Sequence, residues 1–119
     1  MMTLAQAAAW MAQTLPQVRY GSAAAAEEAN QITLQRVHTD SRSVQPGDLF
    51  IALRGERLDA HDFLAQAQAA GAAAAVVELG RSLPGLPCLE VSDTTAALGA
   101  LAAGWRSQFR LPLIAVTGS

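Results

Sequence analysis

Residues 49–78, LFIALRGERLDAHDFLAQAQAAGAAAAVVE, decide the fold. The run 49–53 is continuously apolar, as in a strand that is buried on both faces, and residues 74–78 form a second strand of this kind. Between the two strands we predict a polar loop over 54–60 and a helix over 61–70. A strand, a helix and a strand connected this closely predict a parallel sheet.

The predicted helix has its own start and stop signals. Asp59 is the expected N-cap, because a carboxylate there accepts the free backbone N–H groups of the first turn. Phe63, Ala67 and Ala70 line one face at helical spacing. Gly71 follows as the residue that ends the helix.

The segments before this unit predict a helix, a strand and a turn. The Thr3–Gln6 capping box starts a helix that Pro16 ends. Residues 21–30 are small and polar and predict a loop or a short extra turn. The side chains of residues 32–39 alternate between two faces, which predicts a strand, and residues 45–48 predict a turn. The apolar face of the helix consists of Leu4, Ala8, Met11 and Leu15.

The segments after it continue the alternation of strands and helices. A loop over 80–87 precedes a strand over 88–91, and Asp93 caps a third helix. A final strand is expected over 112–116. We therefore predict a small three-layer α/β domain with a mostly parallel or mixed sheet flanked by helices. The apolar positions of the third helix are Leu98, Leu101, Trp105 and Phe109.

Composition excludes several classes of protein. The 119 residues are 51% hydrophobic and 15% charged, which excludes a disordered chain, and one cysteine excludes a disulfide scaffold. The net charge of −2 argues against binding of nucleic acid or an anionic membrane. No secretory signal or membrane-spanning run is present, so we expect a cytoplasmic protein in which Cys88 is a buried apolar residue. The chain has no lysine and so cannot hold a complete phosphate-binding P-loop.

Three clusters are candidates for a binding site. Thr39-Asp40-Ser41-Arg42 follows a strand and brings together hydroxyl, carboxylate and guanidinium groups, which read polar ring edges or phosphates. The competing interpretation is a turn in which Asp40 and Ser41 bond their own backbone. The third cluster, Thr117-Gly118-Ser119 after an apolar strand, is typical of the first half of a phosphate loop.

The second cluster, Gly55–Asp62, follows the buried strand at 49–53 and opens a helix. Ligands bind outside the carboxyl ends of strands in open α/β sheets, and a helix N-terminus favours an anion. Arg57 suits a diphosphate. Asp59 and Asp62 oppose an anion at the same end and are equally explained as helix caps.

Taken in order, these motifs resemble the N-terminal region of the Mur ligases over roughly residues 34–119. The resemblance rests on Thr39–Arg42, Pro46–Leu53, Gly55–Phe63, Gly71-Ala72, Asp93-Thr94 and Ala115–Ser119. GER, DAHDF and TGS favour the branch that adds D-alanyl-D-alanine to UDP-N-acetylmuramoyl-tripeptide in peptidoglycan synthesis. The alternative branch adds a diamino acid or lysine to the dipeptide precursor.

The resemblance implies an ATP-dependent amide ligase. ATP, with Mg²⁺, phosphorylates a carboxylate of the UDP-sugar peptide, and the amine of D-alanyl-D-alanine then displaces the phosphate. Residues 1–110 would be the UDP-sugar-binding domain, and 111–119 the first strand and the start of the P-loop of an ATPase domain. This part alone is expected to be inactive, to contain no catalytic residue or metal ligand, and to have neither ATP nor Mg²⁺ bound.

The resemblance also implies which residues bind. Thr39 and Ser41 are expected at the uridine, and Glu56, Arg57 and Leu58 at the uracil or the diphosphate. Arg42, Asp59 and His61 are further candidates, although Arg42 is as well explained as tying its turn to the sheet through a carboxylate. Thr117, Gly118 and Ser119 would begin the ATP site. Phe50 is expected in the core rather than at the ligand.

The expected partners are UDP-N-acetylmuramoyl-tripeptide and, for the whole ligase, D-alanyl-D-alanine. We expect a monomer that does not bind nucleic acid and does not insert into a membrane. A different class also fits the sequence: a freestanding, non-catalytic module that binds a nucleotide sugar.

Overall fold

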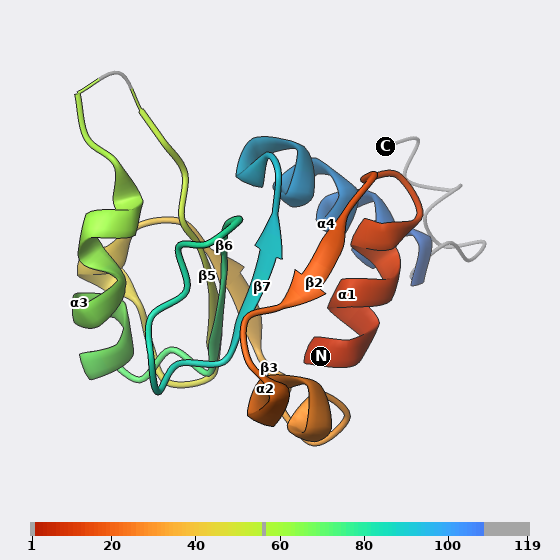
Figure 1. Ribbon diagram of the computed structural model, residues 1–119, viewed down its shortest axis with the longest axis horizontal. Helices are drawn as coiled ribbons and strands as arrows, with labels where there is room; N and C mark the ends of the chain where they lie inside the picture. The colour runs from red at the N-terminus through yellow and green to blue at the C-terminus, as the bar shows by residue number, and fades with distance from the viewer. Residues whose placement is uncertain (1, 56, 109–119) are drawn as a thin grey trace, which may run out of the picture.

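The computed structural model describes residues 2–55 and 57–108, and for residues 105–108 the backbone alone. Within these residues, five strands form a mixed sheet in the order β2-β7-β6-β5-β4 (Figure 1). Neighbouring strands from β4 to β7 are parallel, and β2 pairs antiparallel with β7 at one edge. The strands are β2 (Val18–Tyr20), β4 (Arg36–His38), β5 (Asp48–Ile51), β6 (Ala74–Glu78) and β7 (Cys88–Val91).

Helices cover both faces of this sheet, which confirms the three-layer α/β prediction (Figure 1). A separate pair of short strands joins residues 2–3 to 33–34. The remaining elements are α1 (Leu4–Ala12), α2 (Ala23–Glu28), α3 (Leu64–Ala69), α4 (Thr94–Gln108), the 3₁₀ turns η1 (Ser41–Ser43) and η2 (Ala60–Phe63), β1 (Met2–Thr3) and β3 (Thr33–Leu34).

The alternation of side chains along β5 supplies two separate cores. Leu49 and Ile51 pack in the cluster that contains the buried faces of α1 and α4. Phe50 packs in the opposite cluster, with Leu64 and Ala67 of α3. Since Phe50 is fully buried, its expected place in the core is confirmed. A strand buried on both faces needs apolar residues at every position, which is why 49–52 is a continuous run.

The local start and stop signals are also confirmed. Thr3 and Gln6 form a reciprocal capping box at α1. The carboxylate of Asp93 accepts the backbone N–H of Thr95 at 2.9 Å. Gly71 ends α3 with φ +103°, a conformation that glycine adopts without steric cost.

Other predictions need correction. The strand expected over 32–39 is two strands: β3 pairs with β1 and β4 with β5, and between them the Gln35 N–H bonds to the Gly47 carbonyl at 2.8 Å. Residues 23–28, expected as loop or extra turn, form α2, and β2 was not predicted. α1 ends at Ala12, before Pro16, and its buried face contains Ala7 in addition to the expected Ala8, which is partly buried against the same core. The helix expected over 61–70 begins as the 3₁₀ turn η2.

The predicted strand over 112–116 and Phe109 lie outside the described residues, as does the side chain of Trp105. Among the described residues, no helix has both the length and the apolar character needed to cross a membrane.

Candidate functional site

A cleft of about 560 Å³ lies beside the carboxyl ends of β4 and β5. Two loops that follow these parallel strands meet there, as expected for a ligand site in an α/β sheet. The lining residues are Thr39, Asp40, Ser41, Arg42, Leu53, Leu58, Ala60, Phe63 and Gln66. The cleft thus joins the first and second sequence clusters.

The loop after β4 is ordered by its own aspartate. Asp40 caps η1 by accepting the Arg42 N–H at 2.9 Å, and it also accepts the Arg42 guanidinium at 3.1 Å. These hydrogen bonds hold the pKa of the Asp40 carboxyl below its usual range. The competing interpretation, a turn bonded to itself, therefore holds for Asp40. Thr39 and Ser41 line the cleft beside it.

Arg42 does not tie this turn to the sheet, which was one of the two interpretations offered for it. Its side chain is 82% exposed, and its guanidinium bonds the carboxylate of Asp40 in its own turn. Arg36 makes the tie instead: its Nε lies 2.7 Å from Asp48 Oδ1 and its Nη2 lies 2.9 Å from the Ser43 carbonyl. Arg36 and Asp48 are paired in the parallel register of β4 and β5, so their side chains lie next to each other on the sheet.

Asp48 is the buried half of this ion pair, with 1% of its side chain exposed. Burial opposes its ionisation, but the bonds from Arg36 and from the Gln45 N–H outweigh burial and keep the pKa of Asp48 below its ordinary value. Ser43 is held from a second side, because its hydroxyl lies 2.6 Å from Nε2 of His38. Together these contacts fix the loop that carries Thr39 and Ser41.

The loop after β5 is a narrow hairpin that projects beyond the sheet (Figure 1). The Gly55 N–H bonds to the Leu58 carbonyl at 2.8 Å, and the Ala60 N–H bonds to the Leu53 carbonyl at 2.9 Å. Leu58 is 67% exposed and lines the cleft. Arg57 is exposed but is not part of the lining, and Glu56 lies outside the described residues.

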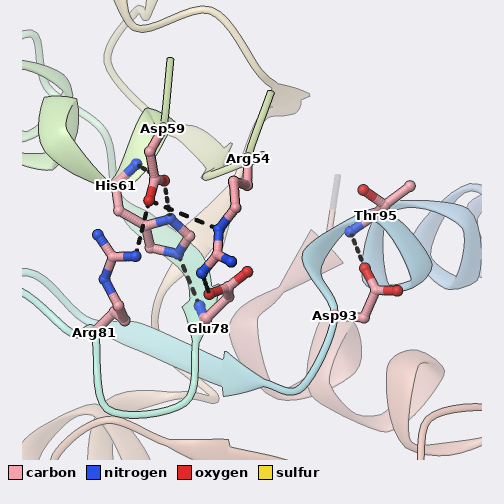
Figure 2. A network of polar contacts seen from close by, with 7 residues as sticks. All are labelled: Arg54, Asp59, His61, Glu78, Arg81, Asp93 and Thr95. Atoms are coloured by element: carbon pink, nitrogen blue, oxygen red, sulfur yellow. Dashed lines mark hydrogen bonds and ion pairs between the residues drawn. The ribbon is translucent and has the colours of Figure 1, made fainter. Parts of the chain in front are cut away.

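At the base of this hairpin lies a charged network (Figure 2). Asp59 Oδ2 accepts Arg81 Nη1 at 2.9 Å and lies 3.9 Å from Nε of Arg54, which also pairs with Glu78. Asp59 Oδ1 accepts both the backbone N–H of His61 at 3.0 Å and the ring nitrogen Nδ1 at 2.6 Å. Burial raises the pKa of Asp59, but the bonds from His61 and Arg81 prevail and hold it well below its usual range.

His61 has one possible tautomer in this arrangement. Its Nε2 accepts the backbone N–H of Glu78 at 2.9 Å, so that nitrogen holds no proton. The ring proton is therefore on Nδ1, which donates to Asp59. The side chain is 1% exposed and has both nitrogens bonded. His61 is thus a neutral link between the start of η2 and the end of β6.

The structure brings together some of the predicted site residues and separates others. Thr39, Ser41, Arg42 and Leu58 line one cleft, whereas Asp59 and His61 lie in the network behind it. Sequence reasoning missed Leu53, Ala60, Phe63 and Gln66 as lining residues. Helical spacing had assigned Phe63 to the core face, so the sequence carried no signal for its place in the cleft.

The expectations about metal and ATP concern two different parts of the chain. The described residues contain no group of three or more His, Cys, Asp or Glu side chains that could hold a metal ion. The residues expected to begin the ATP site, Thr117, Gly118 and Ser119, lie outside the described part of the chain.

Known proteins are similar to this chain in sequence and in fold. The family model "Mur ligase family, catalytic domain" matches residues 33–106, more than half of the chain. The Escherichia coli K12 UDP-N-acetylmuramoyl-tripeptide–D-alanyl-D-alanine ligase is 51% identical over 88 residues, which are 74% of this chain and 19% of that enzyme. The Geobacillus kaustophilus UDP-N-acetylmuramoyl-L-alanyl-D-glutamate–2,6-diaminopimelate ligase is 45% identical over 82 residues, covering 67% and 17%.

Among solved structures, the Acinetobacter baumannii UDP-N-acetylmuramoylalanyl-D-glutamyl-2,6-diaminopimelate–D-alanyl-D-alanyl ligase superposes with a TM-score of 0.71 at 37% identity. The match covers 90% of this chain and 22% of that protein. The chain spans about a fifth of the length of the curated relatives it matches. On the agreement of the family model, the relatives and the fold, the chain belongs to the Mur ligase family.

Proposed function

We propose that residues 1–110 form the UDP-sugar-binding part of a ligase that adds D-alanyl-D-alanine to UDP-N-acetylmuramoyl-tripeptide in peptidoglycan synthesis. One observation supports it above all: the Thr39–Arg42 loop and Leu58, which the family resemblance implicates in UDP-sugar binding, line one cleft at the carboxyl ends of parallel strands. The 51% identity to the E. coli enzyme of this name supports the choice within the family.

The chemistry of the cleft suits a nucleotide base. The hydroxyl groups of Thr39 and Ser41 both donate and accept hydrogen bonds, as the polar edge of a uracil ring requires. Leu58 and Phe63 offer apolar surface to the ring faces. We assign the diphosphate to Arg57 and Arg42, which are both exposed near this cleft, and we keep Glu56, which precedes Arg57 in the sequence, as a further candidate. Asp59 and His61 then act on the ligand through the loop that they hold.

The chemical step belongs to the rest of the ligase. We propose that 111–119 begin its ATPase domain, with Thr117, Gly118 and Ser119 opening the phosphate loop. ATP would transfer its terminal phosphate to the tripeptide carboxylate, and the amine of D-alanyl-D-alanine would displace that phosphate to form the amide. ATP with Mg²⁺ would act there, so the part described here would bind substrate without turning it over.

The setting we propose is a cytoplasmic monomer. Cys88 is buried in β7, and burial raises the pKa of its thiol, so it behaves as the small apolar residue expected there. A buried, protonated thiol is compatible with a reducing compartment.

Calorimetric titration of the 119-residue chain with UDP-N-acetylmuramoyl-tripeptide tests the binding role. We expect saturable binding, competition by UDP, and no competition by GDP, since only the uracil edge matches the cleft. Absence of binding, or equal competition by GDP, would refute the proposal.

A second candidate is the ligase that adds a diamino acid to the dipeptide precursor, because the Geobacillus relative with that name is 45% identical. The two are separated by assaying the complete enzyme with both substrate pairs. The first proposal expects phosphate release only with the tripeptide and D-alanyl-D-alanine. Activity with the dipeptide and diaminopimelate alone would favour the second.

A further inference from the structure

The wall of the cleft at Leu58 and Ala60 is supported from behind. Both residues flank Asp59 in the sequence, and both line the cleft, whereas Asp59 and His61 do not. Within the hairpin, the backbone bonds that involve these two wall residues are Gly55 N–H to Leu58 and Ala60 N–H to Leu53. These two bonds fix the hairpin's internal shape. They do not fix its position against β6.

Two side-chain contacts fix this position: the ion pair of Arg54 with Glu78 at the end of β6, and the buried imidazole of His61. One ring nitrogen donates to Asp59 at 2.6 Å, and the other accepts the backbone N–H of Glu78 at the end of β6. The ring is 1% exposed, so a lost bond would leave a buried polar group without a partner. This cost restricts the ring to one orientation, in which it links the start of η2 to the end of β6.

We infer that Asp59 and His61 are positioning residues for the ligand of the cleft: the doubly bonded His61 ring ties the hairpin to β6 and so sets where Leu58 and Ala60 meet the ligand. The identity of that ligand rests on the proposed function. Arg81 and Arg54 complete the support, because they hold the other oxygen of Asp59. Neither Asp59 nor His61 touches the ligand in this arrangement.

Three substitutions at His61 test the inference, with UDP-N-acetylmuramoyl-tripeptide as the calorimetric probe. His61→Ala removes both bonds and should raise Kd about tenfold. His61→Asn keeps a donor near the Nδ1 position, and His61→Gln keeps an acceptor near the Nε2 position, so each should restore part of the affinity. Asp93→Ala is the control. Asp93 accepts the backbone N–H two residues later at the start of α4 (Figure 2), as Asp59 does at the start of η2, but it does not line the cleft, so its loss should leave Kd unchanged.

Nitrogen-15 and methyl NMR provide the readout that does not need the ligand. We expect His61 protonated at Nδ1 only, and a shift of the Leu58 methyl signals in His61→Ala but not in Asp93→Ala. Protonation at Nε2, unmoved Leu58 signals, or an unchanged Kd in His61→Ala would each overturn the inference. If the wild-type chain does not bind the probe, the proposed function is refuted, and the Leu58 signals alone decide whether His61 positions the hairpin.

Discussion

Gly104 and Gly99 lie on the same helix, α4, but in different surroundings. A Cβ atom added to Gly104 would lie 2.5 Å from Cγ and 2.6 Å from Cδ2 of the Trp10 ring on α1. A Cβ added to Gly99 would meet nothing within 4 Å. The same substitution, glycine to alanine, therefore isolates the packing of α4 against α1.

The expected magnitudes follow from two opposing contributions. In a helix interior, alanine is more favourable than glycine by about 1 kcal/mol, so Gly99→Ala should raise the free energy of unfolding by about that amount. Gly104→Ala gains the same contribution but forces Trp10 aside, and overpacking of this kind costs about 1–3 kcal/mol. We expect Gly104→Ala to be neutral to about 2 kcal/mol destabilising, and less stable than Gly99→Ala by about 1–3 kcal/mol.

Equilibrium unfolding in urea measures this difference, provided that the m-value is unchanged. A double-mutant cycle identifies its cause: in a Trp10→Ala background the obstruction is gone, and Gly104→Ala should become as stabilising as Gly99→Ala. If Gly104→Ala and Gly99→Ala are equally stable in the wild-type background, or if Trp10→Ala leaves their difference intact, the described packing of the two helices is wrong.

Three further predictions concern the site. Asp59→Asn keeps an acceptor for His61 but turns an amide NH2 group towards Arg81. Because the pKa of Asp59 is lowered in the folded state, its carboxylate contributes fully to stability above the unfolded pKa of about 3.9, and this contribution is lost progressively as the pH falls below that value. The difference in unfolding free energy between wild type and variant should therefore shrink by about 1 kcal/mol between about pH 6 and about pH 3, and a constant difference in urea titrations would contradict this. Ser41→Ala should weaken binding of UDP-N-acetylmuramoyl-tripeptide by about 0.5–1.5 kcal/mol in calorimetry, whereas Ser92→Ala, an exposed serine that is not among the residues lining the cleft, should not; equal effects would remove Ser41 from the site. Asp48→Asn keeps an acceptor for only one of its two donors, Arg36 and the Gln45 N–H, and turns an NH2 group towards the other. It should cost about 2–3 kcal/mol of unfolding free energy, and a loss below about 0.5 kcal/mol would show that the pair with Arg36 contributes little.

The parts of the fold that sequence reasoning predicted are those whose cause is local. β5 and β6 appear as apolar runs because both faces of each strand are covered, and Gly71 ends α3 because its φ is positive. β2 was missed because a three-residue strand, Val18–Tyr20, has too few positions to show a period. Its antiparallel partner lies more than 60 residues away in the sequence, so no local pattern marks it.

The same distinction applies to the cleft. That Thr39, Ser41 and Leu58 meet was predictable, because each follows a parallel strand and such strands end at one edge of a sheet. Phe63 was placed on the core face by helical spacing, yet it lines the cleft. Residues 60–63 form a 3₁₀ turn, which has three residues per turn, so the spacing of an α-helix does not carry across into α3.

Two ion-pair networks explain why charged residues of the motifs proved hard to assign. Arg36 with Asp48 holds the loop that carries Thr39 and Ser41, and Asp59 with Arg81 holds the hairpin that carries Leu58. The motif thus contains two kinds of polar residue, those that line the cleft and those that fix its walls. Exposure distinguishes the buried wall residues from the lining: the Asp48 and His61 side chains are each 1% exposed, whereas those of Asp40 and Arg42 in the lining are 43% and 82% exposed. Burial depends on the assembled sheet, so no pattern in the chain could have made that separation.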